Sequence, residues 1–494
     1  PSTDRLYENV ATADSPHPYY RDVSDSVGIL IEGYGLGLAI SDINQDGWPD
    51  VYVANDFIAS DLLYINNPQG PFESRLDEYV QHISRNGMGV DVADINNDAL
   101  PDILVLDMLP PSAIRQKTMT ASMNYDHFRY TLKQDFSPQF IRNTLQINRG
   151  VAPDGNYRFS ELGRLAGLHE TDWSWSPLIV DFDNDGLKDV YITNGFRRDV
   201  TDHDFQEYTE QTNAYVRGSG KLSIPEVVAR LLQLDSVCLS NFMLQNRDSL
   251  RFVDKTQDWG MDHPSMSNGS AYADFDQDGD LDLVVNNINA PAFLYENKGQ
   301  SENDYHYLRV KLVGNTPNRN ALGAKVTATL KDGKKLYYEN YPVRGYMSTS
   351  ESIIHLGLGE ATQLDTLEII WPDGKQQRHT SLAVDTTYQF SYGDNDFLPA
   401  KDQTIFPPSN HLFEEVSAEL INGYQHKENV SEDFRYEPLL LHQFDNYGPG
   451  LAVGDMNSDG RTDFFVGGAR YHNGTLSFQT ENQTFTSEEL TDTE

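Results

Sequence analysis

One nine-residue pattern occurs five times along the chain and constrains its fold more than any other feature. Each copy reads Asp-x-Asp/Asn-x-Asp-Gly/Ala-x-x-Asp, where x is any residue. The copies span residues 42–50, 94–102, 181–189, 274–282 and 455–463, and are called loops 1 to 5. Position 6 is glycine in every copy except loop 2, which has Ala99. Five copies in one register make coincidence a poor explanation.

The pattern predicts a cation-binding loop. Side-chain oxygens at positions 1, 3, 5 and 9, with the backbone carbonyl of position 7, can converge on a hard cation such as calcium. Glycine at position 6 allows the sharp turn that this convergence needs. Such ions are expected to be structural, since they neutralise carboxylates and fix the turn. We expect up to five Ca²⁺ ions, one in each loop, with these ligands: Asp42, Asn44, Asp46, Trp48 and Asp50; Asp94, Asn96, Asp98, Leu100 and Asp102; Asp181, Asp183, Asp185, Leu187 and Asp189; Asp274, Asp276, Asp278, Asp280 and Asp282; Asp455, Asn457, Asp459, Arg461 and Asp463.

The five loops differ from the EF-hand, which needs a glutamate at position 12 and lies between two helices. Position 12 is β-branched in every copy: Val53, Val105, Ile192, Val285 and Val466. Strand-forming residues follow each loop, so each loop is expected to join two strands. A small residue lies five positions before each first aspartate, and we expect a shared turn there: Gly37, Gly89, Ser176, Gly269 and Gly450.

The spacing of the loops predicts an all-β fold built from propeller blades. A short phrase of alternating apolar residues recurs after loops 1 to 4, at 61–67, 143–148, 241–246 and 292–297. Each repeat is therefore expected to be an antiparallel meander of about four strands. Residues 4–22 resemble the end of such a repeat, so the chain is expected to start inside a blade.

The repeats divide the chain into predicted domains. Residues 1–300 are expected to form a β-propeller, and 305–392 a small all-β module with turns at Asp332-Gly333 and Pro372-Asp-Gly374. Residues 393–410 are polar with three prolines and are predicted to be a linker, while 411–494 begin a second propeller. A short helix is expected at 223–234, inside an insertion.

Charge limits the partners that the chain can bind. It has 37 basic and 75 acidic residues and a net charge of -38, which repels the phosphates of nucleic acids. Its one cysteine, Cys238, excludes an internal disulfide framework. Loops of this kind are typical of extracellular modules, where calcium is abundant, so an extracytoplasmic location is expected. No run of about 18 apolar residues predicts a membrane span.

Several motifs resemble those of a known family. The loops and their flanking phrases resemble FG-GAP/VCBS repeats, and 320–326, 344–348, 355–359 and 371–374 resemble the ASPIC/UnbV signature. The whole is similar to the group that includes relatives of cartilage acidic protein. More narrowly, 106–110, 142–145 and 171–176 resemble surface lipoproteins of Bacteroidota. This resemblance implies an exported β-propeller protein at the cell surface or outer membrane of a Gram-negative bacterium, without implying an activity.

Two classes of function remain open. The first is a cell-surface binding module for other surface proteins or an extracellular polymer or peptide, accessory to nutrient uptake. The second is a calcium-assisted lyase or hydrolase acting in a propeller cleft. The sequence contains no nucleophile elbow or zinc-ligand spacing, which favours the first class. Alternation through Ser174 places Trp173 and Trp175 on the same face, where core or inter-blade packing is expected, with a sugar or peptide site as the alternative. Structural roles are expected for His355 and Arg344.

We also expect the 494 residues to be part of a longer polypeptide. A closed propeller needs its last strand to meet its first, whereas only four loops precede the module and a single blade follows it. Two or three blades are expected before Pro1, with most of a second propeller after Glu494. Membrane association would then depend on a lipid anchor in the N-terminal part or on a partner.

Overall fold

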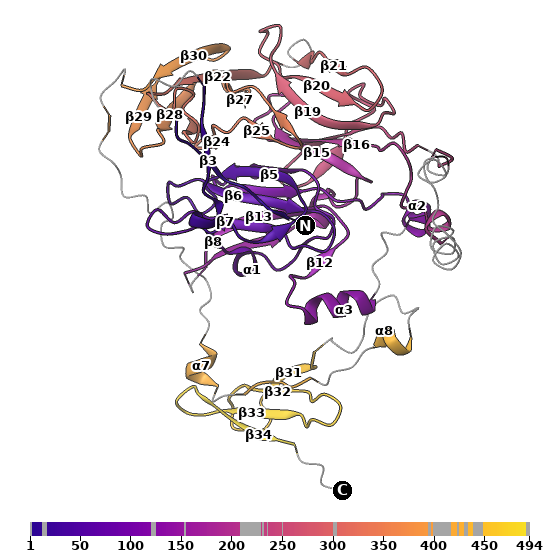
Figure 1. The fold of residues 1–494 in the computed structure, drawn as a ribbon. Coiled ribbons are helices and arrows are strands. Elements are labelled where there is room, and N and C mark those ends of the chain that lie inside the picture. The colour runs from indigo at the N-terminus through magenta and orange to yellow at the C-terminus, as the bar shows by residue number, and fades with distance from the viewer. Residues whose placement is uncertain are drawn as a thin grey trace. The chain divides into compact units, whose positions relative to one another are not determined.

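The computed structural model describes residues 2–11, 17–119, 125–152, 155–207, 229, 232–234, 236–248, 250–299, 304–393, 397–398, 416–421, 424–428, 433–437 and 448–490. The chain forms two compact units, Pro1–Asp402 and Gln403–Glu494. Strands dominate both of them, which confirms the predicted all-β fold (Figure 1).

Four antiparallel sheets follow one another along the first unit (Figure 1). Their strands are β5 (Gly35–Ser41), β6 (Asp50–Asn55), β7 (Leu62–Ile65) and β8 (Glu73–Ser74); β10 (Val90–Ala93), β11 (Asp102–Val105), β13 (Thr144–Val151) and β14 (Tyr157–Glu161); β15 (Ser174–Val180), β16 (Asp189–Asn194), β17 (Phe242–Asn246) and β18 (Phe252–Asp254); and β19 (Ser267–Ala273), β20 (Asp282–Asn287) and β21 (Phe293–Tyr295). The first strands are neighbours, since β5 contacts β10, β10 contacts β15 and β15 contacts β19. Consecutive meanders with adjoining first strands are arranged like propeller blades. The fourth sheet has three strands instead of the expected four.

Loops 1 to 4 each join the first and second strands of one sheet. In every case the second strand begins at the position 9 aspartate, which pairs with the last residue of the first strand. The four loops therefore lie at equivalent ends of their sheets. This placement follows from the sequence, because a tight polar loop followed directly by a run of β-branched and other apolar residues is typical of a hairpin.

The prediction of a shared turn before each loop is wrong. Gly37, Ser176 and Gly269 lie within the first strands β5, β15 and β19, next to register shifts in the pairing. The reason is close packing between neighbouring blades. A Cβ on Gly37 would lie 2.5 Å from the carbonyl oxygen of Met88. Small residues here let adjacent first strands approach each other.

Short elements precede the first blade. They are β1 (Ser2–Thr3), β2 (Tyr7–Asn9), β3 (Tyr20–Asp22), the 3₁₀ helix η1 (Ser24–Val27) and β4 (Glu32–Gly33). β1 pairs with β4, and β2 with β3. Ile29 packs in a cluster with Val53 and Tyr64 of the first sheet. The N-terminal segment thus covers one face of that sheet.

The connections between blades carry short helices and one small parallel sheet. These elements are α1 (Leu76–Tyr79), β9 (Ile83–Ser84), α2 (Ala113–Thr118), α3 (Tyr125–Lys133), β12 (Gln139–Phe140) and α4 (Gly163–Ala166). The helix expected at 223–234 falls largely outside the described residues. No helix in the described part of the chain is both long and apolar enough to cross a membrane.

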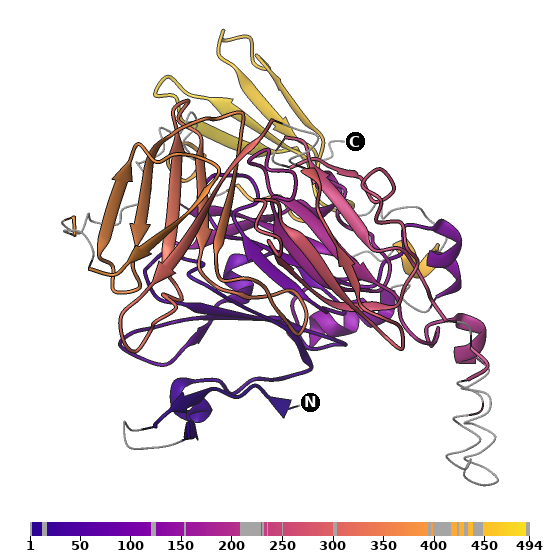
Figure 2. The same ribbon diagram turned by 90° about the horizontal axis from the view of Figure 1, so that it is seen from above.

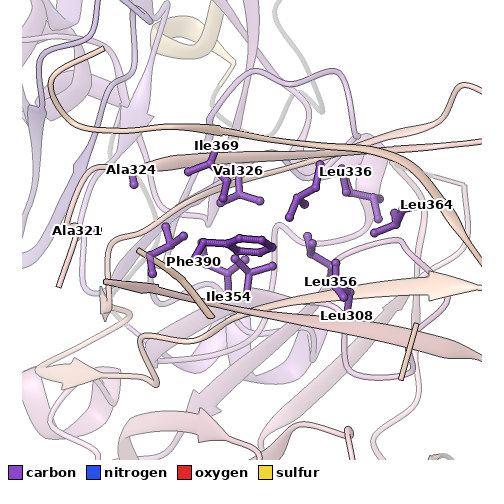
Figure 3. Close-up of a cluster of buried hydrophobic side chains, with 14 of the residues drawn as sticks. Leu308, Ala321, Ala324, Val326, Leu336, Ile354, Leu356, Leu364, Ile369 and Phe390 are labelled. Carbon is purple, nitrogen blue, oxygen red and sulfur yellow. The ribbon is translucent and has the colours of Figure 1, made fainter. Parts of the chain in front are cut away.

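Residues 306–391 form a two-sheet module within the first unit (Figures 1 and 2). One sheet has the order β27-β22-β30 and the other β24-β23-β28-β29. The strands are β22 (His306–Val313), β23 (Lys325–Leu330), β24 (Lys335–Glu339), β27 (Ile354–Gly359), β28 (Leu364–Ile370), β29 (Gln376–Thr380) and β30 (Thr386–Ser391). Buried side chains from both sheets form one core, with Phe390 among them (Figure 3).

A hairpin of this module reaches the first strands of the blades. Its strands are β25 (Val343–Arg344) and β26 (Ser348–Thr349). β25 contacts β5 and β10, and β26 contacts β19. The hairpin therefore lies against the first strands of the first, second and fourth sheets, and the module packs directly on the blades.

The second unit contains one four-stranded antiparallel sheet. Its strands are β31 (Leu451–Gly454), β32 (Asp463–Val466), β33 (Thr475–Gln479) and β34 (Phe485–Glu489), preceded by α7 (Ser417–Leu420) and α8 (Asp433–Tyr436). Loop 5 joins β31 to β32 as the other loops join their strands. The predicted linker 393–410 lies mostly outside the described residues.

Candidate metal centres

Backbone N–H groups hold the two end carboxylates of every loop. Oδ2 of the position 1 aspartate accepts the N–H of position 6, over 2.7 Å in loop 1 and 2.8 Å in loop 3. Oδ2 of the position 9 aspartate accepts the N–H of position 2, and its Oδ1 accepts an N–H from the end of the third strand or from the one or two residues that follow it. The same bonds recur in loops 2, 4 and 5. The backbone thus orients both carboxylates.

Three carboxylates converge in each of two loops. Asp181, Asp183 and Asp189 of loop 3 each offer an oxygen within 4.8 Å of the others, and the matching residues of loop 4, Asp274, Asp276 and Asp282, do the same. Loops 1, 2 and 5 have asparagine at position 3. In these three loops the asparagine Nδ2 donates to the position 5 carboxylate over 2.8 to 2.9 Å. Loops 3 and 4 therefore concentrate more negative charge.

One carboxylate oxygen is left without a partner in loops 1, 3 and 4. Oδ1 of Asp42, Asp181 and Asp274 is buried and accepts no hydrogen bond, and these residues are 3%, 2% and 7% exposed. In loops 2 and 5 the corresponding oxygen accepts the N–H of position 5. A buried acceptor without a partner is costly, and a bound cation would satisfy it. The residues present therefore fit a metal ion best in loops 1, 3 and 4.

Burial also makes ionisation of these carboxyls expensive. It raises the pKa of Asp50 to about 8, and it raises that of Asp94 to about 6. Burial, with the charge of Asp183 nearby, raises the pKa of Asp181 and Asp189 well above the usual range. A divalent cation favours the charged forms and would remove this cost.

The turn at position 7 is tight in all five loops. The N–H of Trp48, Leu100, Leu187, Asp280 or Arg461 donates to the position 5 carboxylate over 2.7 to 3.0 Å. In loop 4 the Asp280 side chain accepts from Asn184 of loop 3 over 2.8 Å. Its carboxylate is thus engaged with the neighbouring loop.

Hydrogen bonds join loops 1 to 4 in series, a feature that the sequence reasoning missed. The position 4 side chain donates to the position 6 carbonyl of the following loop: Gln45 to Ala99, Asn97 to Gly186 and Asn184 to Gly279. These three donors have left-handed backbones, with φ of 54°, 59° and 59°. The recurrence of Gln or Asn at position 4 of loops 1 to 4 was the sequence signal from which these hydrogen bonds could have been predicted.

Basic side chains approach the loops and were also missed. Lys325 and Arg309 of the 306–391 module form ion pairs with Asp42 and Asp274, the latter over 2.8 Å. Lys188 of loop 3 is buried, and its Nζ donates to the carbonyl oxygen of Asp94 over 2.6 Å. Nothing in the local sequence marks these contacts, because the residues are far apart along the chain.

The other residues singled out from the sequence occupy structural positions. His355 is buried and donates its Nε2–H to Asn184 Oδ1 over 2.6 Å, and burial lowers its pKa to about 3. Arg344 is buried beside Asp91 at 2.8 Å. Trp173 and Trp175 stack with ring centroids 5.9 Å apart and pack against a buried methionine cluster.

Two family models match this chain where the loops and the module lie. The model of the FG-GAP-like repeat matches residues 42–105, and that of ASPIC and UnbV matches residues 314–396. This chain therefore contains an FG-GAP-like repeat and an ASPIC/UnbV module. The 306–391 module is accordingly called the ASPIC/UnbV module below.

Curated relatives of this chain share the name cartilage acidic protein 1. The Xenopus tropicalis protein is 25% identical over 57% of this chain and 45% of its own length. The Mus musculus and Homo sapiens proteins are 23% and 43% identical over 52% of this chain and cover 41% and 40% of their own lengths. This chain therefore spans less than half the length of these relatives.

Among solved structures, the V. cholerae biofilm matrix protein Bap1 matches 77% of this chain and 56% of its own, at 11% identity and a TM-score of 0.21. A TM-score this low gives no information about the fold of this chain. The repeats and the curated relatives point to an extracellular or secreted, β-propeller-like interaction module.

Proposed function

We propose that this protein is a calcium-binding interaction module outside the cytoplasm, with loops 1 to 5 as its calcium sites. The observation that carries the proposal is the buried Oδ1 of Asp181. It has no hydrogen-bond partner and belongs to a residue in a group of three converging carboxylates. A cation held by these oxygens would neutralise charges that burial penalises.

The donor set favours calcium over other metals. The predicted ligands are carboxylate, carboxamide and backbone oxygens, without histidine or cysteine. Oxygen-only sites suit hard cations, and calcium accepts the irregular geometry of a flexible loop more readily than magnesium does. Bound calcium would fix the connection between the first two strands of each blade, so its role is structural.

The whole protein would act at the cell surface of a Gram-negative bacterium, in contact with other surface proteins or an extracellular polymer or peptide. There it would be an accessory to nutrient uptake at the outer membrane. A cleft of about 340 Å³ next to loop 1 supports a binding role. It is lined by Asp46, Arg75, Glu78, Tyr79 and Tyr157 among others. Its volume is at the lower end of the range for small-ligand sites, and it combines aromatic and charged groups.

The alternative is a calcium-assisted lyase or hydrolase acting in this same cleft. It is favoured by one observation, namely that Asn44 and Asp46 of loop 1 border the cleft. An enzyme of this kind would cleave a polymer only with calcium present, and Asp46→Asn would abolish cleavage. A binding module would retain the polymer without cleaving it.

Thermal unfolding in calcium and in excess chelator tests the calcium proposal. Ligands that bind only the folded state raise its stability, so calcium should raise the melting temperature by several degrees. Asp181→Asn should reduce that gain, while the exposed control Asp332→Asn should leave it unchanged. An equal melting temperature of the wild type in both buffers would refute the proposal.

A further inference from the structure

The ASPIC/UnbV module presents an acid and a base to loop 1. Lys325 and Glu339 lie directly opposite each other in the register of β23 and β24. Lys325 Nζ pairs with Oδ2 of Asp42. Glu339 accepts the backbone N–H of Asp42 over 3.2 Å and the hydroxyl of Ser41. Both side chains of the module thus converge on the first aspartate of the loop.

The module makes a matching contact with loop 4. Arg309 on β22 pairs with Oδ2 of Asp274 over 2.8 Å. Glu351 accepts the backbone N–H of Asp274 over 3.4 Å and also pairs with Arg309. Arg309 and Lys325 are both buried. The module therefore places an acid and a base on equivalent residues of two loops, with the two bases on different strands, β23 and β22.

These contacts leave one carboxylate oxygen free in each loop. Oδ2 of Asp42 and of Asp274 is taken by the basic side chain and the position 6 N–H, while Oδ1 has no hydrogen-bond partner. In loop 3, by contrast, Asp181 forms no ion pair within the described ranges, and its Oδ2 accepts only the N–H of Gly186. A metal ion would share the first aspartate with a resident cation in loops 1 and 4, but not in loop 3.

We propose that Lys325 and Arg309 are resident counter-ions that dock the ASPIC/UnbV module on the metal loops and weaken cation binding in loops 1 and 4. This inference rests on the calcium sites proposed above. The physical reason is that a lysine or arginine charge beside the shared carboxylate repels a second cation in a partly buried site. Docking of the module and occupancy of these two loops are then linked, since each changes the free energy of the other.

Loop 1 carries its own reporter for a test. Trp48 at position 7 is 48% exposed, and loops 2 to 5 have no tryptophan at this position. Terbium replaces calcium in oxygen sites and luminesces when a nearby tryptophan is excited. The part of the terbium signal that disappears in Trp48→Phe therefore belongs to loop 1. Calcium added to the wild type should displace terbium from loop 1 and so remove this signal.

The test compares terbium titrations of wild type, Lys325→Met and Lys335→Met. Methionine keeps an unbranched apolar stem and removes the charge. Lys335 is an exposed control on the same hairpin, paired with Thr329 at the far end of β23. We expect the loop 1 midpoint of Lys325→Met to fall roughly fivefold or more, as for other coupled sites. Lys335→Met should titrate like the wild type.

A Lys325→Met midpoint equal to or higher than that of the wild type would overturn the counter-ion role. Failure of the calcium proposal gives a different result, because calcium would then not displace terbium even from the wild type. Amide hydrogen exchange of the wild type gives a second readout if Lys325→Met does not fold. Calcium should alter protection in β23 and β24, and a change restricted to the loops would overturn the linkage.

Discussion

Gln45 of loop 1 donates its side-chain Nε2–H to the backbone carbonyl of Ala99 in loop 2. The same two positions join loop 2 to loop 3 and loop 3 to loop 4. The acceptor is always the residue at the sharpest point of the next loop, where φ is 70°, 83° or 98°. Loops 1 to 3 thus each help to hold the conformation in which the following loop presents its ligands.

Gln45→Ala should destabilise the protein by about 1 kcal/mol, the usual value of such a hydrogen bond. The same substitution should weaken calcium binding in both loop 1 and loop 2. Gln277→Ala is the matched control, because Gln277 has the same position in loop 4 and a similar φ of 65° but an exposed side chain. Urea unfolding in calcium measures both variants, and equal losses of stability would contradict the coupling between loops.

Ala99→Gly should stabilise the calcium-bound protein by up to about 1 kcal/mol. Ala99 has a φ of 70°, a left-handed conformation that penalises a Cβ, whereas glycine adopts it freely. Ala93→Gly at the end of β10 is the control and should lower the stability, because glycine weakens a strand. Loss of stability in Ala99→Gly would mean that the free energy of backbone strain at Ala99 is smaller than the free-energy cost of the extra conformational entropy that glycine gives the unfolded chain.

Asp276→Ala should remove most of the calcium affinity of loop 4, whereas Gln277→Ala should retain it. The carboxylate of Asp276 belongs to the converging group, whereas Gln277 is not one of the three residues of that group. Calorimetric titration of the chelator-treated variants counts the sites that remain. Equal effects of the two substitutions would mean that the alternation of ligand positions is wrong.

Asp61 gives a dependence of stability on pH that does not involve the loops. It is buried, accepts the hydroxyl of Tyr52 over 2.6 Å, and burial raises its pKa to about 7. Its unfolded pKa is about 4, so between these values the folded state binds more protons than the unfolded state. The contribution of Asp61 to stability therefore falls as pH rises from about 4 to 7.

Asp61→Asn removes this titration. The free energy of unfolding of the wild type, minus that of the variant, should decline from pH 5 to pH 7 and become constant near pH 8. Urea unfolding at saturating calcium provides both values at each pH. A difference that grows with pH would contradict the raised pKa of Asp61.

The local pattern of the sequence was sufficient to predict much of this fold. A tight polar loop followed by a run of β-branched and other apolar residues favours a hairpin, and a hairpin forms in all five copies. Alternation placed Trp173 and Trp175 on one side, where they stack. The prediction of a turn at Gly37 was wrong because a small residue suits either a turn or a close approach between two backbones. The packing of β5 against Met88 shows that Gly37 serves a close approach.

The contacts that surround the loops could not be predicted in this way. Lys325 and Asp42 are 283 residues apart, and their ion pair depends on how the ASPIC/UnbV module packs on the blades. Glu339 and Glu351 likewise look like ordinary surface acids in the sequence. Distant charge pairs leave no periodic signal, so the candidate ligands were predictable while their neighbours were not.

The amount of metal bound by the folded chain tests the central claim most directly. The protein would be saturated with calcium, separated from free ions by gel filtration and analysed by inductively coupled plasma mass spectrometry. The loops predict five calcium ions per chain, and removal of the position 1 aspartate from one loop should lower the number by one. A folded wild-type protein that retains less than one calcium ion per chain would contradict the account.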